Sequence, residues 1–218
     1  MRILSFWRRA WHHGMTAVRR DAKKEYDARF YDRIYRRGGD RKEYFKPPEE
    51  SVYYPAWMGL IARLDRNEAR ILELGCGPGQ LAILLLRSGF RYLRGIDFSG
   101  EAIAMARKTA GEGHWDKFVF GDLYDETLYR AVEYNTVICG EVLEHLERDL
   151  AVLDLIRPAA KVLGTVPNYA SRAHVRHFDD EGQIRSRYRS SLEIRSIQKI
   201  AINPYGNALF LIDSQKKF

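Results

Sequence analysis

The chain has 218 residues, of which 45% are hydrophobic and 30% are charged, and its formal net charge is +7. This length suits one domain, and the hydrophobic fraction excludes a wholly disordered chain. The longest apolar run, Leu81–Leu86, is far shorter than a membrane-spanning helix requires. The first six residues lack the apolar core of a signal peptide, and the two cysteines, Cys76 and Cys139, suit a reducing compartment. We therefore expect a soluble, cytoplasmic protein.

The basic excess lies entirely in the N-terminal fifth of the chain. Residues 1–46 contain 14 Lys and Arg against 6 Asp and Glu, whereas the other 172 residues contain 22 against 23. Such a segment suits contact with phosphate, an anionic surface or an acidic partner, and it equally suits a solvated helical face. Apolar residues recur in it at helical spacings, so we expect helices here, with breaks at Gly14 and at Gly38 and Gly39.

Helical and strand patterns then follow one another along the chain. We expect helices over residues 54–64, 80–88, 99–110 and 141–156, and strands over 70–74, 91–96, 117–120, 134–139 and 159–166. Two further strands, 191–201 and 208–214, flank a turn-rich tetrapeptide and predict a terminal hairpin. The alternation predicts a doubly wound α/β, Rossmann-like fold. Its seven-stranded sheet would be mostly parallel, with an antiparallel C-terminal hairpin strand, and N-terminal helices would precede it.

Three glycines follow the first predicted strand and precede a helix, in the stretch Ile71-Leu-Glu-Leu-Gly-Cys-Gly-Pro-Gly-Gln80. Without Cβ atoms, Gly75, Gly77 and Gly79 let the backbone turn sharply and approach a ligand closely. Asp97 ends the next strand, where it can accept hydrogen bonds from ribose hydroxyls. These features predict an adenosine-containing ligand, and both a nicotinamide dinucleotide and S-adenosylmethionine fit that much.

The spacing G-x-G-x-G, with Pro78 in the loop and Glu73 in the strand, resembles motif I of class I S-adenosylmethionine-dependent methyltransferases. Three later segments are similar to the same family in the same order. They are Arg94-Gly-Ile-Asp-Phe-Ser99, Gly121-Asp-Leu123 and Tyr134-Asn-Thr-Val-Ile-Cys-Gly-Glu-Val-Leu-Glu-His-Leu146. In the last of them, Asn135 stands where the family often has Asp. The resemblance covers residues 69–166.

The resemblance implies S-adenosyl-L-methionine as the cofactor. The cofactor-binding residues that it implies are Glu73, Gly75, Cys76, Gly77, Gly79, Asp97, Phe98, Asp122, Leu123, Gly140, Glu141 and Tyr54. Among them, Asp122 could instead cap a helix that begins near Asp125, and Cys76 could be a small packing residue. The implied organisation is an N-terminal helical lid or extension over residues 1–66 and an S-adenosylmethionine-binding methyltransferase domain over 67–218.

Two carboxylates and an imidazole open the long predicted helix, in Glu141-Val-Leu-Glu-His145. Glu141 and His145 are four residues apart and would share one helical face, with Glu144 beside them. The array resembles that of two metal-dependent groups, the ubiquinone-biosynthesis O-methyltransferases and the small-RNA 3′-terminal 2′-O-methyltransferases, in which a later histidine could complete a cation site. The same helix opening also occurs in relatives that use no metal. We therefore predict no metal, and keep a cation held by Glu141, Glu144 and His145 as the alternative.

Acceptor-side candidates follow the fifth predicted strand, in the segment that contains Asn168, His174, Arg176 and His177. Two histidines with two arginines nearby suit an anionic or hydroxyl-bearing acceptor. The catalytic candidates are therefore His145, Glu141, His174 and His177, with His145 as a general base or as a group that orients the acceptor.

The predicted function is S-adenosylmethionine-dependent methyl transfer to a small-molecule acceptor, at oxygen or nitrogen. One alternative is an RNA methyltransferase that uses residues 1–46 as a phosphate-binding arm. Because the sequence has no RNP motif, zinc knuckle or helix-turn-helix, this alternative ranks second. Another alternative is a partner subunit that binds the cofactor without turnover. The number of copies in the assembly is not predicted.

Overall fold

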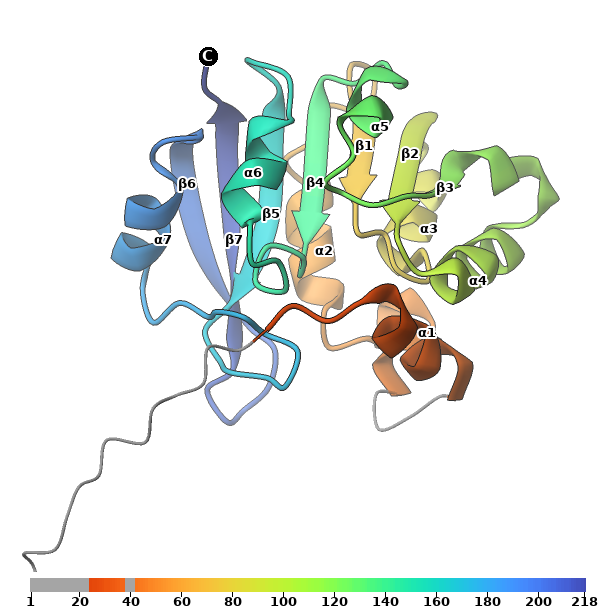
Figure 1. Cartoon of the computed structure of the whole chain (residues 1–218), viewed down its shortest axis with the longest axis horizontal. Coiled ribbons are helices and arrows are strands. Elements are labelled where there is room, and N and C mark those ends of the chain that lie inside the picture. The colour runs from red at the N-terminus through yellow and green to blue at the C-terminus, as the bar shows by residue number, and fades with distance from the viewer. Residues whose placement is uncertain (1–23, 38–41) are drawn as a thin grey trace, which may run out of the picture.

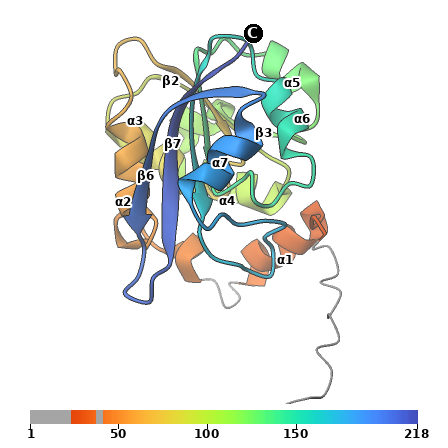
Figure 2. The same ribbon diagram turned by 90° about the vertical axis from the view of Figure 1, so that its left-hand side faces the viewer.

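One seven-stranded sheet with helices on both faces forms the centre of the computed structural model, which describes residues 24–37 and 42–218 (Figures 1 and 2). Its strands are β1 (Arg70–Leu74), β2 (Tyr92–Asp97), β3 (Phe118–Phe120), β4 (Thr136–Gly140), β5 (Lys161–Pro167), β6 (Leu192–Ala201) and β7 (Ala208–Lys216). The strand order is β3-β2-β1-β4-β5-β7-β6. Strands β1 to β5 run parallel, whereas β7 is antiparallel to both β5 and β6. The predicted fold class is therefore confirmed.

The helices lie between the strands much as the apolar patterns predict. They are α1 (Ala28–Arg37), α2 (Tyr54–Ile61), α3 (Gln80–Arg87), α4 (Gly100–Ala110), α5 (Glu126–Arg130), α6 (Asp149–Asp154) and α7 (Glu181–Tyr188), with 3-10 helices η1 (Lys42–Phe45), η2 (Pro48–Glu50) and η3 (Glu112–Lys117). Ser99 begins α4 as predicted, because its hydroxyl accepts a hydrogen bond from the Ala102 N–H at 3.2 Å. The prediction omits α7. No helix within residues 24–37 and 42–218 is long and apolar enough to cross a membrane.

The long helix predicted over residues 141–156 is wrong for its first two turns. Helix α6 begins only at Asp149, and residues 141–148 form successive turns and bends. Glu141 has a φ of 59°, in the left-handed region, so it cannot open a right-handed helix. Its N–H instead donates to the hydroxyl of Thr165 on β5 at 3.0 Å. Glu141 and His145 therefore do not share a helical face.

Alternating residues of the strands supply two separate apolar layers. On β1, Ile71 packs in the layer that contains α2, α3 and α4, whereas Leu72 and Leu74 pack in the layer that contains α6 and α7. Because successive side chains of a strand point to opposite faces, each buried strand contributes to both layers. Both faces of β1, β4 and β5 are thereby covered, so a ligand can reach these strands at their ends.

Helix α1 lies below the C-terminal ends of β1, β2 and β4 in Figure 1. Its Asp32 accepts hydrogen bonds from the Ser99 hydroxyl at 2.6 Å and from the Glu101 N–H at 3.3 Å, at the start of α4. The helix prediction for residues 1–46 is confirmed for Ala28–Arg37. The rest of that prediction within 1–23, including the break at Gly14, lies outside the described residues, as does the break at Gly38 and Gly39.

Candidate active site

The glycine loop between β1 and α3 follows a backbone path that suits glycine alone. Gly75, Gly77 and Gly79 have φ values of 64°, 52° and 80°, all in the left-handed region. A Cβ atom on Gly75 would lie 2.6 Å from Cγ2 of Val142, so the loop and the chain after β4 approach each other closely. The loop thus brings bare backbone to the C-terminal ends of β1 and β4, where ligands bind in open α/β sheets.

Two buried carboxyl groups, Glu73 and Asp97, lie beside the glycine loop. Asp97 accepts hydrogen bonds from the N–H groups of Gly77 at 2.9 Å and Ser99 at 2.8 Å, one on each oxygen. Each oxygen keeps a second lone pair that can accept from a ribose hydroxyl. Burial raises the pKa of Asp97 to about 6. Burial also raises the pKa of Glu73 to about 8, and one Glu73 oxygen is buried with no hydrogen-bond partner among the described residues. That oxygen suits a cationic group of a ligand.

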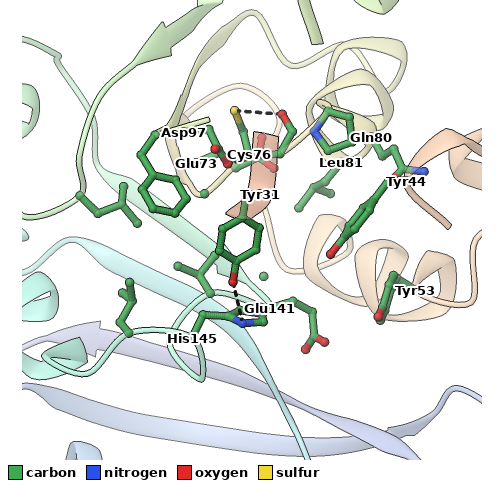
Figure 3. Close-up of a pocket in the computed structure, with 18 of the residues that line it drawn as sticks. Tyr31, Tyr44, Tyr53, Glu73, Cys76, Gln80, Leu81, Asp97, Glu141 and His145 are labelled. Carbon is green, nitrogen blue, oxygen red and sulfur yellow. Dashed lines mark hydrogen bonds between the residues drawn. The ribbon is translucent and has the colours of Figure 1, made fainter. Parts of the chain in front are cut away.

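A cavity of about 360 Å³ lies between the glycine loop and the chain after β4 (Figure 3). Its volume suits a small-molecule site. The acidic residues that line it are Glu25, Glu43, Glu73, Asp97, Asp122 and Glu141, and no Lys or Arg of residues 24–36 and 43–218 joins them. Its aromatic lining consists of Tyr26, Tyr31, Tyr35, Tyr44, Tyr53, Trp57, Phe98 and Tyr169. The cavity therefore combines aromatic surface with an excess of acidic groups.

Two tyrosines of α1 cover this cavity. Tyr31 and Tyr35 are only 9% and 7% exposed, and both line it. The Tyr31 hydroxyl lies 3.2 Å from Nδ1 of His145, and a Cβ atom on Gly77 would lie 3.3 Å from the Tyr35 hydroxyl. Helix α1 thus reaches the glycine loop and the turns after β4 at once, and it closes the space between them.

A second group of titratable side chains lies on the other side of the cavity from Glu73 and Asp97, as the placement of Glu141 and His145 in Figure 3 shows. One ligand atom from each of Glu144, His145 and His174 lies within 4.8 Å of the other two. No N–H or hydroxyl group of the described residues donates to either oxygen of Glu144 or to one oxygen of Glu141, and the two carboxyl groups lie within hydrogen-bond reach of each other. Burial raises the pKa of Glu141 to about 8, and burial together with the Glu141 carboxyl raises that of Glu144.

Backbone carbonyls determine which nitrogen of each histidine can act as a ligand or a base. Nδ1 of His145 lies 2.9 Å from the carbonyl oxygen of Ala173, and Nδ1 of His174 lies 3.0 Å from that of Tyr169. Because a carbonyl only accepts, each Nδ1 carries the proton and, in the neutral ring, Nε2 carries the basic lone pair. Nε2 of His145 lies 3.8 Å from Oε1 of Glu144. A metal-binding histidine commonly donates its other ring N–H to a backbone carbonyl in the same way as Nδ1 does here.

Most of the residues singled out in the sequence line the cavity. They are Glu73, Gly75, Cys76, Gly77, Asp97, Phe98, Asp122, Leu123, Gly140, Glu141, His145 and His174. Gly79, Tyr54, Glu144, Asn168, Arg176 and His177 do not. A Cβ atom on Gly79 would lie 2.9 Å from Cβ of Ala106, so this glycine permits the packing of α3 on α4. Tyr54 packs against the apolar layer of α2, and the adjacent Tyr53 lines the cavity instead. His177 is exposed.

Several lining residues were not predicted as site residues. They are Glu25, Tyr26, Tyr31, Tyr35, Glu43, Tyr44, Trp57 and Tyr169. The four-residue spacing of Tyr31 and Tyr35 indicates one helical face, but nothing in the sequence says what that face covers. Asp122 lines the cavity, and the residue that caps α5 is Asp125, whose carboxylate accepts from the Thr127 N–H at 2.9 Å.

The glycine loop, the buried acid at the end of β2 and the seven-stranded sheet together define the class I S-adenosylmethionine-dependent methyltransferases, whose cofactor is S-adenosyl-L-methionine. The chain belongs to the methyltransferase domain family, whose sequence model matches residues 50–199.

Curated relatives and solved structures carry the same class of name. A trans-aconitate 2-methyltransferase of Streptomyces avermitilis is 33% identical over 127 residues, which cover 54% of this chain and 46% of that protein. A ubiquinone biosynthesis O-methyltransferase of Paracidovorax citrulli is 26% identical over 150 residues, covering 66% and 62%. The chain spans about half the length of the curated relatives it matches. The Burkholderia thailandensis 1,6-didemethyltoxoflavin-N1-methyltransferase, solved with S-adenosylhomocysteine, shares the fold with a TM-score of 0.66 and 19% identity, covering 88% of this chain and 87% of that one.

Proposed function

We propose that the protein transfers the methyl group of S-adenosyl-L-methionine to a hydroxyl oxygen of a small acceptor that carries no negative charge. The observation that carries the proposal is the cavity itself, which the glycine loop and Asp97 line on one side and Glu141, His145 and His174 on the other. Methyl transfer from a sulfonium requires the acceptor and the methyl carbon to be held in line, and an enclosed cavity between two such groups supplies that orientation.

The cofactor side is assigned to Glu73, Asp97 and the glycine loop. The Asp97 carboxylate would hold the ribose hydroxyls, and the Glu73 carboxyl oxygen without a hydrogen-bond partner would meet the ammonium group of the methionine part. Helix α1 would act as a lid, because Tyr31 and Tyr35 close the cavity from above the loop. We extend this role to the described part of the N-terminal segment 1–66, which is residues 24–37 and 42–66, with residues 67–218 as the cofactor-binding domain.

The side chains on the acceptor side of the cavity do not favour the anionic acceptor that the arginines after β5 suggest in the sequence. Arg172 is exposed and contacts Tyr26, and Arg176 binds backbone carbonyls, so neither lines the cavity. Away from the cation site proposed below, an acceptor carboxylate or phosphate would therefore meet acidic side chains and no Lys or Arg of residues 24–36 and 43–218, and repulsion between like charges disfavours this. Aromatic residues such as Tyr44, Tyr53 and Tyr169 favour a flat, largely apolar acceptor.

We further propose that Glu144, His145 and His174 hold a divalent cation, which reverses our preference from the sequence. The fit rests on three features of these residues. The ligand atoms lie within 4.8 Å of one another, both Glu144 oxygens are buried and no N–H or hydroxyl group of the described residues donates to them, and both histidines direct Nδ1 to backbone carbonyls. Such a cation would polarise the acceptor hydroxyl and favour loss of its proton.

The chain's own residues would carry out the proton transfer that accompanies methyl transfer. The acceptor oxygen attacks the methyl carbon, the carbon–sulfur bond breaks, and the sulfur keeps the electron pair to give S-adenosylhomocysteine. The Glu141 carboxylate lines the cavity beside the cluster and can accept the hydroxyl proton. The Tyr31 hydroxyl, which contacts Nδ1 of His145, would help to exclude water when α1 is closed.

The test measures S-adenosylhomocysteine formed from S-adenosylmethionine with matched neutral and carboxylated hydroxyaryl acceptors, before and after treatment with a chelator. We expect turnover with neutral acceptors, little with their carboxylated counterparts, loss of activity with the chelator and recovery with Mg²⁺ or Mn²⁺. Asp97→Asn should weaken S-adenosylhomocysteine binding by about 10-fold or more, since it removes a charged hydrogen-bond acceptor. Chelator-resistant turnover would overturn the cation assignment alone, whereas no binding of S-adenosylhomocysteine by calorimetry would overturn the whole function.

A further inference from the structure

Arg176 lies behind the Glu144 and His145 cluster and does not enter the cavity. One guanidinium nitrogen, Nη1, donates to the carbonyl oxygens of Leu143 and Leu146, and the other, Nη2, donates to that of Glu147 at 3.1 Å. The side chain is only 15% exposed. All three carbonyls belong to the turns after β4, the segment that carries Glu144 and His145.

These contacts replace the hydrogen bonds of the helix that the sequence predicts there. In a helix that opened at Glu141, the carbonyl of Leu143 would accept from an N–H four residues later. In the structure its partner is the Arg176 guanidinium. The carbonyl of Glu144 accepts instead from the N–H groups of Val175 at 2.7 Å and Arg176 at 3.3 Å. The segment after β5 is thereby joined to the turns after β4, and the bond between His145 Nδ1 and the Ala173 carbonyl lies at the same junction.

Asp149 fixes the guanidinium of Arg176 in this place. Its carboxylate, with only 1% of the side chain exposed, lies 3.1 Å from Nη1 of Arg176. Arg187 of α7 binds the same carboxylate through two nitrogens, at 2.5 and 2.8 Å, and the Tyr188 hydroxyl donates to it at 3.1 Å. Within residues 24–37 and 42–218, Arg187 makes no hydrogen bond to the turns 141–148. Arg176 and Arg187 therefore share one buried acid, and only Arg176 touches the cluster's backbone.

We propose that Arg176, held by Asp149, is a positioning residue that fixes the turns 141–147 so that His145 faces the cavity with the buried Glu144 carboxyl beside it. Breaking a buried, hydrogen-bonded ion pair is costly, so the guanidinium has one stable position. The three carbonyls that it binds need its planar fork of donors, which a lysine cannot reproduce. The catalytic consequence rests on the proposed function, but the geometric claim does not.

The experiment compares Arg176→Lys with Arg187→Lys in the full chain, because both substitutions keep the charge beside Asp149. Long-range ¹H–¹⁵N NMR reports which imidazole nitrogen carries the proton, and His145→Gln assigns the signal. After dialysis against a chelator, wild type and Arg187→Lys should show His145 protonated at Nδ1. Arg176→Lys should show a mixture of the two tautomers, because the bond to the Ala173 carbonyl loosens with the turn. Identical His145 signals in all three proteins would overturn the proposal, and so would an equal change in both lysine variants.

Kinetics provide the second measurement. With a hydroxyaryl acceptor that the wild-type protein methylates, Arg176→Lys should lower kcat by about 10-fold or more, while its affinity for S-adenosylhomocysteine stays within about 2-fold of wild type. Arg187→Lys should keep the wild-type kcat. If Arg176→Lys does not fold, as judged by circular dichroism and thermal unfolding, Asp149→Asn replaces it with the same expectations. A wild-type protein without turnover would contradict the proposed function, and the NMR comparison would still decide the role of Arg176.

Discussion

Replacing Glu73 by Gln should stabilise the ligand-free protein at neutral pH while weakening its hold on the cofactor. The carboxyl is 4% exposed, one of its oxygens lacks a hydrogen-bond partner, and burial, followed by the negative charge of Asp97, raises its pKa from 4.5 to about 8. A raised pKa means that the folded protein keeps a proton that the unfolded chain releases. The unfolding free energy therefore falls as pH rises from about 4.5 to 8.

The magnitude follows from the shift. Each pKa unit corresponds to about 1.36 kcal/mol, so a shift of roughly 3.5 units costs about 3 kcal/mol at pH 7 and about 4 to 5 kcal/mol above pH 8. Glutamine keeps the shape and removes the titration. The difference in unfolding free energy between Glu73→Gln and wild type should grow by about 3 kcal/mol, in favour of the variant, between pH 5 and pH 8.

The assay is urea unfolding at pH 5, 6, 7 and 8, with Glu112→Gln on the exposed η3 as the matched control. The control should follow the wild-type curve at every pH. Calorimetry with S-adenosylhomocysteine should show binding to Glu73→Gln weakened by about 10-fold or more, since a charged partner of the ammonium is lost. Stability curves of wild type and Glu73→Gln that run parallel across this range would refute the reasoning about burial.

Two further predictions concern the glycine loop and the lid. Gly75→Ala should lower the unfolding free energy by about 2 kcal/mol or more, because its φ of 64° disfavours a side chain and the new Cβ would lie 2.6 Å from Val142. In the same urea assay, Gly100→Ala, where nothing lies within 4 Å of the added Cβ, should change it little, and equal losses would contradict this account of the loop. Asp32→Ala should raise amide hydrogen exchange across α1 by about 10-fold or more, because it removes the hydrogen bonds from Ser99 and Glu101. Arg36→Ala breaks only an exposed ion pair with Glu101 and should have a much smaller effect, and the reverse order would show that Asp32 does not hold the lid.

The cofactor half of the cavity could be predicted from the sequence because its signals are local. A strand, a left-handed glycine turn and a helix are consecutive in the chain, and each leaves its own pattern of apolar and glycine residues. Asp97 belongs to the next strand, so its place beside the loop follows from parallel pairing of β1 and β2, in which Glu73 lies opposite Gly95. The parallel pairing of two neighbouring strands is enough to place Glu73 and Asp97 beside the loop.

The acceptor half could not be predicted in the same way, because its geometry depends on distant partners. Helical spacing in residues 141–156 favours a helix from the first residue, and intrinsic propensity alone gives no reason for it to start late. The delay comes from Thr165 and Arg176, which bind the backbone of that segment from positions 24 to 33 residues further along the chain. Glu141 and His145 therefore converge through turns, and His174 joins them from the segment after β5.

The acidity of the cavity connects the two halves. Glu73 and Asp97 line one side of the cavity, and Glu141 lines the other with the buried Glu144 behind it. Burial raises the pKa of all four carboxyl groups. Ionisation of each of these acids lowers the unfolding free energy of the protein without ligands. That free energy is therefore lowest at the pH values at which the carboxylates are charged and can bind a cation. A cationic methionine ammonium beside Glu73 and a divalent cation beside Glu144 would relieve that cost on opposite sides of the same space. The cofactor and the cation should therefore each raise the unfolding free energy more at pH 8 than at pH 6. This arrangement of acids requires the stabilisation by both ligands to increase with pH.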